Sequence, residues 1–451
     1  MLTFLSTGIP PYDFSENQAS ILFFQQNREN NHVFLFYSLE RNQMGKNQVL
    51  VGIEIGTSKV CTVVAEGCGN DGVRLLSVGK IPSKGVRKGE IVDFPTAVRC
   101  VHEALADAEE KSDVEIDSVW AAVTGSHIVS FNSRGAIRIP ENRAEIDLED
   151  LSDVETNAKE ICLPPQHDFL HAIIQHYYVD GKDGILDPVG MVGTCLEADF
   201  HIVHGVTTRL QNTVRCIREA AVEVENIVLS ALASAQTVLA PQQKELGALV
   251  VDIGGGVTDY ILYVNGVVRH SGVLAIGGDH VTSDISMGLH IPIQKAEELK
   301  VEVGSTSLEA ALPGDTVLLK SSSGFPGCEV ERHVLNTIIH VRVRELFEIL
   351  KKRVQNECSL HMLGAGIILS GGCSLLQGIK SLAEEVFEIP VYLTHANTAD
   401  HVSAFENPRL STVIGLLKYV HTIQTGLPQP TLLQRLGRRV GMLFGKRRTL
   451  A

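Results

Sequence analysis

The chain has 451 residues, of which 44% are hydrophobic and 20% are charged, and it carries a net charge of −14 from 39 basic and 53 acidic side chains. A chain of this length is expected to divide into roughly two to four domains, and its composition excludes a wholly disordered protein. The acidic balance argues against nucleic-acid binding, which needs basic side chains on the phosphates, and no run reaches the ~18 apolar residues of a spanning helix.

The first 43 residues differ in composition from the rest of the chain. They hold 8 of the 24 aromatic residues without clean periodicity, and they lack the basic start and apolar core of a signal peptide. At Met44 the sequence MGKNQVLVGIEIG runs directly into an apolar strand. We expect Met44 to be the natural start, so that 1–47 is a disordered extension or a mispredicted start; a real accessory arm is the alternative.

From residue 49, apolar strands alternate with amphipathic helices, which indicates an α/β fold. Two segments share one plan of strand, acidic residue, glycine turn and second strand: VLVGIEIGTSKVCTVVAEG at 49–67 and ALVVDIGGGVTDYILYVNGVV at 248–268. Glycine has no Cβ, so backbone N–H groups at such turns can approach phosphate oxygens, and hydroxyls and a lysine add donors. The predicted phosphate contacts are Gly56, Thr57, Ser58, Lys59, Gly254, Gly255, Gly256 and Thr258.

An acidic side chain stands two residues before each glycine turn, Glu54 in the first segment and Asp252 in the second. A carboxylate that faces a phosphate is useful only when a divalent cation or its water shell lies between them. The pair therefore predicts Mg²⁺ held through water.

A third glycine pair, Gly371 and Gly372, lies in GIILSGGCSLLQGI at 366–379, which reads as a buried strand, a turn and a helix. Such a turn lets the adenosine part of a nucleotide lie against the backbone. Gly277 and Gly278 precede another helix. Polar side chains that would hold a ribose follow at helical spacing, although an exposed helix face explains them equally well: Glu297, Glu298 and Lys300.

These segments together resemble the actin-like ATPase superfamily, in which two related α/β domains close over ATP and Mg²⁺. VGIEIGTSKV corresponds to the first phosphate motif, VVDIGGGVTDY to the second and IILSGGCSLLQGI to the adenosine motif. The resemblance implies a two-domain, actin-like (ribonuclease H-like) fold. SALASAQTVL at 230–239 resembles the helix on which actin carries its water-positioning glutamine, so Gln236 and Asp252 are the implied catalytic residues.

Two positions depart from the superfamily pattern. Glu54 stands where many members have Asp, and Val257 stands where the second motif often has Thr. The longer carboxylate would shift the metal and the valine removes a hydroxyl. We therefore expect ATP binding with weak ATPase activity at most.

The stretch 129–205 reads as a mixed β/α insert with a helix near 147–161, and its place and form resemble the small subdomain of the FtsA family of bacterial cell-division proteins. The resemblance runs from about residue 48 to the C-terminus and includes GVRKGEIVD, DPVGMVG, GGDHVTSDI and STVIGLLKY. It implies a protein that tethers the tubulin-like GTPase FtsZ to the cytoplasmic face of the inner membrane at the division site. Actin-like filaments and contacts with other division proteins are also implied.

The resemblance also implies a division of the chain into subdomains. These are 1A (48–128 and 206–244), the insert 1C (129–205), 2A (245–285 and 356–423) and 2B (286–355), followed by a linker at 424–430.

In this family the C-terminal peptide of FtsZ binds the subdomain predicted here at 286–355. Its helical stretch ERHVLNTIIHVRVRELFEILKKRV places an apolar stripe at i, i+3, i+4 spacing: Leu335, Ile338, Ile339, Leu346, Ile349 and Leu350. The basic residues lie largely off this stripe. The simpler explanation for these basic residues is a solvent-exposed helix face. The more specific explanation is a peptide-binding surface, for which Arg332 and Asn336 are the candidate contacts.

The chain ends in a segment, 431–451, that has six basic residues and no acidic one. On a helix its apolar side chains gather on one face: Leu432, Leu433, Leu436, Val440, Leu443 and Phe444. The basic side chains lie outside that face: Arg435, Arg438, Arg439 and Lys446. This pattern predicts an amphipathic helix on anionic lipid. Three glycines, each costing about 1 kcal/mol of helix propensity, lead us to expect a helix that forms only on the membrane.

Other proteins of the same superfamily remain as alternatives. A sugar or acetate kinase would need a further catalytic acid in the cleft, and the sequence shows no acidic motif beyond Glu54 and Asp252. The pilus-assembly protein PilM shares the fold and the insert but lacks a basic amphipathic tail. A chaperone is disfavoured, because only about eighty residues follow the adenosine glycines, too few for a substrate-binding domain.

Overall fold

The computed structural model describes residues 48–68, 72–140, 145–321, 325–394 and 407–426. The predicted extension 1–47 and the membrane-helix candidates from Leu432 to Lys446 lie outside these residues, as does the linker from 427 onward.

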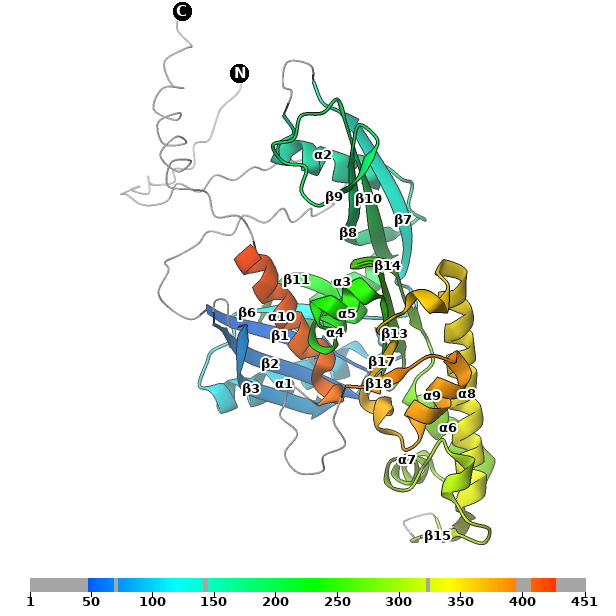
Figure 1. The fold of residues 1–451 in the computed structure, drawn as a ribbon. Coiled ribbons are helices and arrows are strands. Elements are labelled where there is room, and N and C mark those ends of the chain that lie inside the picture. Colours follow the sequence, from blue (N-terminus) through cyan, green and yellow to red (C-terminus); the bar gives the residue numbers. More distant parts are fainter. Residues whose placement is uncertain (1–47, 69–71, 141–144, 322–324, 395–406, 427–451) are drawn as a thin grey trace, which may run out of the picture. The chain divides into compact units, whose positions relative to one another are not determined.

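Two five-stranded sheets repeat one topology (Figure 1), with the strand orders β3-β2-β1-β6-β11 and β14-β13-β12-β17-β18. In each sheet the central strand pairs antiparallel with its hairpin partner and parallel with a later strand. The first sheet contains β1 (Gln48–Ile55), β2 (Lys59–Gly67), β3 (Val73–Pro82), β6 (Ser118–Val123) and β11 (Glu223–Leu229). The second contains β12 (Ala248–Ile253), β13 (Thr258–Val264), β14 (Val267–Leu274), β17 (Ile367–Ser370) and β18 (Val391–Leu393). The repeat confirms the predicted two-domain, actin-like fold.

Helices cover both faces of the first sheet. The helices α1 (Phe94–Ser112) and α3 (Thr207–Arg218) share a core with β1 and β2 on one face. On the other face, α4 (Ser230–Val238) and α10 (Ser411–Gly426) pack in a core that also contains side chains of the second sheet. The two helices cross at Gly415, where an added Cβ would lie 1.9 Å from the carbonyl oxygen of Ala233. The two sheets are thus packed together through α4 and α10.

The second sheet has its own helical layer, formed by α6 (Gly278–Leu289), α7 (Ile293–Glu302), α8 (Arg332–Glu357) and α9 (Ile379–Phe387). The apolar stripe predicted on α8 is confirmed, because all six side chains belong to this core or pack against it. A two-stranded hairpin, β15 (Thr316–Leu319) and β16 (Cys328–Glu331), precedes α8, and the short α5 (Pro241–Leu246) precedes β12.

The insert forms a four-stranded sheet of order β7-β10-β8-β9 with one helix, α2 (Leu148–Lys159). Its strands are β7 (Val129–Arg138), β8 (His167–Val179), β9 (Lys182–Ile185) and β10 (Cys195–Val206), and it has a separate small core. The helix predicted near 147–161 is α2, which begins at a capping box formed by Asp147 and Asp150.

The insert also bonds the edge strand of the second sheet. Ser130 Oγ donates to the carbonyl of Ser271 at 2.7 Å, and Gln175 Nε2 donates to the carbonyl of Val268 at 2.6 Å. These side chains satisfy carbonyls of β14 that an open sheet edge would leave exposed. We call the first five-stranded sheet with its helices the first lobe, and the second sheet with its helices the second lobe. The insert is joined to both, because the chain enters it from β6 and leaves it into α3 of the first lobe, and its side chains bond β14 of the second.

Within the described ranges, none of the helices combines the length and apolar character that a bilayer crossing requires.

Candidate functional site

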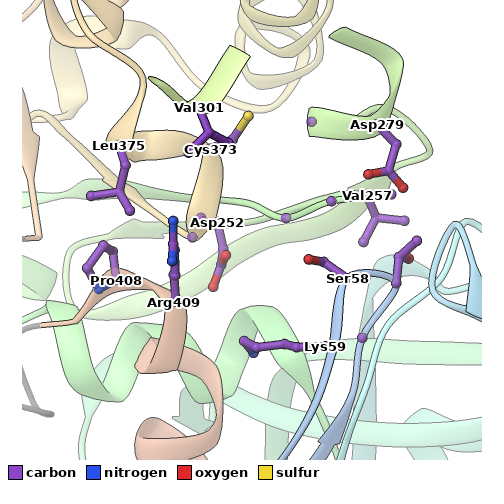
Figure 2. A pocket seen from close by; sticks show the side chains of 18 of the residues that line it. Ser58, Lys59, Asp252, Val257, Asp279, Val301, Cys373, Leu375, Pro408 and Arg409 are labelled. Atoms are coloured by element: carbon purple, nitrogen blue, oxygen red, sulfur yellow. The ribbon is translucent and has the colours of Figure 1, made fainter. Parts of the chain in front are cut away.

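A cavity of about 750 Å³ lies where the two glycine hairpins face each other. Its walls come from the β1–β2 and β12–β13 turns, the start of α6, one face of α7, the turn after β17 and the segment before α10. Figure 2 shows Lys59 entering from the blue hairpin, Asp252 from the end of its strand and Arg409 from the segment before α10. Segments more than three hundred residues apart in the sequence thus line one space.

The structure brings most of the predicted cofactor-binding residues to this cavity. They are Glu54, Gly56, Thr57, Ser58, Lys59, Asp252, Gly254, Gly255, Gly256, Gly278, Glu297, Lys300, Gly371 and Gly372.

The two glycine turns form a cradle of backbone donors. The N–H groups of Gly56 and Gly254 close their own turns on the carbonyls of Lys59 and Val257, both at 2.9 Å. The next two N–H groups of each turn have no acceptor among the residues that the structure describes: Thr57, Ser58, Gly255 and Gly256. Four such N–H groups at the wall of one cavity can bind phosphate oxygens.

Close approach between segments also explains several of the glycines. A Cβ on Gly256 would lie 2.5 Å from Thr57 Oγ1 and 2.9 Å from the backbone of Lys88, in the turn between β4 (Val86–Arg87) and β5 (Glu90–Ile91). A Cβ on Gly371, whose φ is +84°, would lie 2.4 Å from Asp252 Oδ1. Gly256 therefore lets the two lobes meet, whereas Gly371 lets the turn after β17 approach Asp252 within the second lobe.

The predicted carboxylates are held in different ways. Lys59 Nζ donates to Glu54 Oε2 at 2.6 Å. Burial acts to lower the pKa of Lys59, but the Glu54 charge and hydrogen bond, together with Cys61 and Asp252, outweigh it, so the pKa is raised and the ammonium stays charged. Burial and the neighbouring Glu54 raise the pKa of Asp252 to about 7, although Thr412 Oγ1 donates to its Oδ2 at 3.0 Å. A bound cation would favour the charged form of Asp252.

The predicted ribose residues are only partly at the cavity. Lys300 is 7% exposed, and its Nζ donates to Glu297 Oε2 at 2.6 Å and to Thr282 Oγ1 at 2.8 Å. Glu298 does not line the cavity; it is exposed and pairs with Lys295 at 2.6 Å. The helical spacing was right, but the face that carries Glu298 points to solvent.

Three further predicted residues do not line the cavity. Thr258 is fully buried and its Oγ1 donates to the carbonyl of Ile276 at 2.8 Å. Gly277 instead packs against the second hairpin, since its Cβ would lie 2.5 Å from the carbonyl oxygen of Gly255. Gln236 lies on α4, and its Oε1 accepts from Lys244 Nζ at 3.0 Å. A water-positioning role for Gln236 does not fit this placement.

The candidate peptide residues on α8 have unlike environments. Arg332 begins the helix, its side chain is 28% exposed, and it lies 3.9 Å from Asp315. Asn336 is fully buried; its Oδ1 accepts from the backbone N–H of Ser305 at 3.1 Å and its Nδ2 donates to the carbonyl of Ser307 at 3.4 Å. Direct contact between Asn336 and a peptide does not fit this burial.

Sequence reasoning missed several polar side chains that line the cavity: Lys80, Thr124, Asp259, Asp279, Arg409 and Thr412. The two acids lie inside the quoted motifs VVDIGGGVTDY and GGDHVTSDI. Strand alternation could have identified Asp259, because it is the direct partner of Asp252 in the β12–β13 register. The expectation that the sequence shows no acidic motif beyond Glu54 and Asp252 therefore missed Asp259 and Asp279, which line the cavity.

Solved structures with a similar backbone support the fold. The chain matches the PilM-PilN type IV pilus biogenesis complex with a TM-score of 0.57 at 15% identity, over 84% of this chain and 99% of that one. It matches MreB5 of Spiroplasma citri bound to ADP with a TM-score of 0.50 at 13% identity, over 84% of this chain and 98% of that one. Identities this low show a shared fold alone.

Sequence comparisons are more specific. The family model for cell division protein FtsA matches residues 249–415, and the model for the SHS2 domain inserted in FTSA matches residues 125–204. The chain is 35% identical over 378 residues to cell division protein FtsA of Pseudomonas aeruginosa, covering 84% of this chain and 90% of that protein. It is 33% identical over 380 residues to cell division protein FtsA of Escherichia coli K12, covering 82% of this chain and 90% of that protein. The chain therefore belongs to the FtsA family of cell division proteins.

Proposed function

We propose that the chain is an ATP-binding division protein that anchors the FtsZ ring to the cytoplasmic face of the inner membrane. The observation that carries the nucleotide part is the cradle of four backbone N–H groups at one cavity, with Lys59 beside it. Family membership supports the division role, and the basic C-terminal segment supports the anchor. Assembly into actin-like filaments and contacts with other division proteins belong to the same proposal.

The residues present fit a nucleotide with Mg²⁺. The glycine turns and Lys59 would hold the phosphates, Glu297 and Lys300 the ribose, and the glycines after β17 the adenosine. In the part of the chain that the structure describes, no three His, Cys, Asp or Glu side chains are grouped to ligate a metal directly. We therefore propose that Glu54 and Asp252 act on the ion through its water shell. The ion, when bound, supplies positive charge against the phosphates.

Replacing Lys59 tests the nucleotide proposal. The change Lys59→Met keeps the length of the side chain but removes its charge, and a charge-assisted hydrogen bond contributes about 1.5–3 kcal/mol. We expect ATP affinity to fall by about tenfold or more, measured by titration with a fluorescent ATP analogue in Mg²⁺. The matched control is Lys295→Met, since Lys295 pairs with Glu298 away from the cavity. Wild-type affinity in both variants would contradict the proposed phosphate site.

The membrane anchor is tested by removing the last segment. We expect the full chain to co-sediment with liposomes containing anionic lipid, and a version that ends at Pro430 to remain in the supernatant. Added FtsZ should be found in the pellet with the full chain and in the supernatant with the shortened version. Liposomes of neutral lipid separate the electrostatic from the apolar contribution. Equal lipid binding by the two versions would contradict the proposal that the last segment anchors the protein to the membrane.

The FtsZ peptide site is proposed for the surface formed by 286–355. Arg332 supports this placement because its partly exposed guanidinium can pair with acidic groups of a peptide. A PilM-like scaffold is the second candidate, supported by the shared fold. Loss of lipid binding on truncation at Pro430 would separate the two candidates in favour of the division anchor.

A further inference from the structure

Asp259 has a carboxyl group at the cavity, and neither glycine motif predicted a role for it. It lies on β13 directly opposite Asp252 on β12, and direct partners of an antiparallel pair share one face of the sheet. Its residue is 6% exposed, and it lines the cavity beside the second glycine turn. Two acids therefore face the same space from the two strands of one hairpin.

A residue of the other lobe fixes the orientation of this carboxyl group. Thr124 follows β6 of the first sheet, and its Oγ1 donates to Asp259 Oδ1 at 2.6 Å. Thr124 also lines the cavity. The second oxygen, Oδ2, has no hydrogen-bond partner within the described residues. One oxygen is thus held across the cleft while the other is available to a molecule in the cavity.

The other candidates for holding a water each have a contact of their own, and Asp252 accepts from Thr412 through Oδ2. Gln236 is outside the cavity with Lys244, and Glu54 is tied to Lys59. Asp279 lies at the start of α6, where it interacts with Lys300 and Glu297 of the ribose side. Asp259 differs from them because Thr124 of the first lobe fixes one of its oxygens, while the other has no hydrogen-bond partner within the described residues.

We propose that Asp259, oriented by Thr124, holds and deprotonates the water that hydrolyses the bound nucleotide; this inference rests on the proposed nucleotide binding. Asp259 Oδ2 accepts a proton from the water, whose oxygen forms a bond to the terminal phosphorus. The bond from that phosphorus to the bridging oxygen breaks, and the bridging oxygen leaves with the electron pair on the nucleoside diphosphate. The proton then passes from Oδ2 to solvent.

The environment of Asp259 fits this role. Burial, together with the charges of Asp252 and Glu54, raises the pKa of Asp259 well above the ordinary range, against the effect of the Thr124 hydrogen bond. A carboxyl group with a raised pKa is a stronger base when it is ionised, so the proposed step starts from the ionised form of Asp259. Because donor and acceptor belong to different lobes, the carboxylate is oriented only when the lobes are closed. Hydrolysis should therefore depend on closure as well as on binding.

The test uses the full chain and measures two quantities, nucleotide affinity and phosphate release in a single turnover. Asp259→Asn keeps an acceptor for Thr124 but removes the base, so we expect release to slow by about a hundredfold or more with affinity within about threefold. Thr124→Val should slow release by about tenfold, and Thr124→Ser, which restores the hydroxyl, should recover most of it.

Matched controls make the same chemical changes away from the cavity. Thr62→Val removes a buried hydroxyl that has no hydrogen-bond partner in the described part of the chain, and Asp150→Asn converts a buried acid of the insert. Both should keep wild-type release and affinity. Thermal unfolding of every variant identifies a loss that comes from misfolding, and the Thr124 pair then still decides the outcome.

Four results would overturn the assignment. They are unchanged release in Asp259→Asn, equal losses of release and affinity, failure of Thr124→Ser to recover release, and a wild-type chain that binds ATP without any turnover. In the last case nucleotide binding stands and only the role of Asp259 falls. If the wild type binds no nucleotide, the proposed function itself fails and the inference falls with it.

Discussion

Individual histidines at the base of the insert are held neutral by their surroundings. His201 is fully buried, with its ring nitrogens 2.8 Å from Asn132 Oδ1 and Ser271 Oγ. His171 Nε2 accepts the backbone N–H of Leu229 at 2.9 Å. Burial lowers the pKa of His201 to about 3 and that of His171 to about 4. Protonation of either ring would place a buried charge or remove an acceptor, so both rings favour folding only while neutral.

This burial predicts that acid destabilises the protein. The pKa of His171 is lower in the folded chain than its ordinary 6.5, so the unfolded chain binds more protons between pH 6.5 and about 4. The stability due to His171 is fully present above pH 6.5 and is lost as pH falls toward 4, by up to roughly 3 kcal/mol. Denaturant unfolding at several pH values measures this slope.

Two substitutions on the same strand separate this effect from general acid unfolding. His171→Gln keeps an acceptor for Leu229 without a titrating ring, and we expect a shallower loss of stability with acid. His176→Gln changes an exposed histidine of β8 and should leave the slope as in the wild type. The idea fails if both variants keep the wild-type slope.

Among the elements, the hairpins and α8 show how far local sequence patterns extend. Glycine turns, flanking acids and the apolar stripe of α8 depend on interactions within a few residues, and all of them form as predicted. The role of one polar residue on α8 depends instead on a distant segment. Asn336 holds the loop that contains Ser305 and Ser307, which lie 31 and 29 residues earlier in the chain.

The two α8 candidates should therefore respond differently to replacement by alanine. Asn336→Ala leaves the buried N–H of Ser305 without its acceptor, so we expect the free energy of unfolding to fall by about 1–3 kcal/mol. Arg332→Ala should keep stability within about 1 kcal/mol and weaken binding of the FtsZ C-terminal peptide severalfold. Chemical denaturation and a peptide titration measure the two effects. Unchanged peptide affinity in Arg332→Ala would move the proposed site elsewhere.

For the whole molecule, the cavity depends on close contact between the lobes at Gly256. The backbone of Lys88 and the hydroxyl of Thr57, both in the first lobe, would lie within 3 Å of a Cβ at this position. Backbone atoms cannot move aside as the end of a flexible side chain can. A methyl group here would therefore hold the two hairpins apart.

We expect Gly256→Ala to reduce nucleotide affinity by about tenfold or more, since phosphate contacts from both hairpins can no longer form together. The matched control is Gly288→Ala in α6, where the added methyl meets the end of the Ile338 side chain. Titration with the fluorescent ATP analogue compares the two variants. Equal affinities would show that closure at Gly256 is not needed for binding.

The sequence by itself determined the features that arise within single segments. The two strand, acid, glycine and strand units, the α8 stripe and the segments of the phosphate and adenosine sites were predictable, because turn chemistry and hydrophobic periodicity act over a few residues. The same local reasoning placed Glu298 and Thr258 at the cavity wrongly, since it does not specify which side chains another segment will satisfy.

Only the tertiary structure decided which residues meet across the cleft. Thr124 and Asp259 are 135 residues apart, and Thr412 reaches Asp252 over 160 residues. Their pairing depends on how two separate sheets pack through α4 and α10, and no local pattern carries that information. For the same reason Gln236, on a helix buried between the sheets, could be assigned to the cavity from sequence and yet lie outside it.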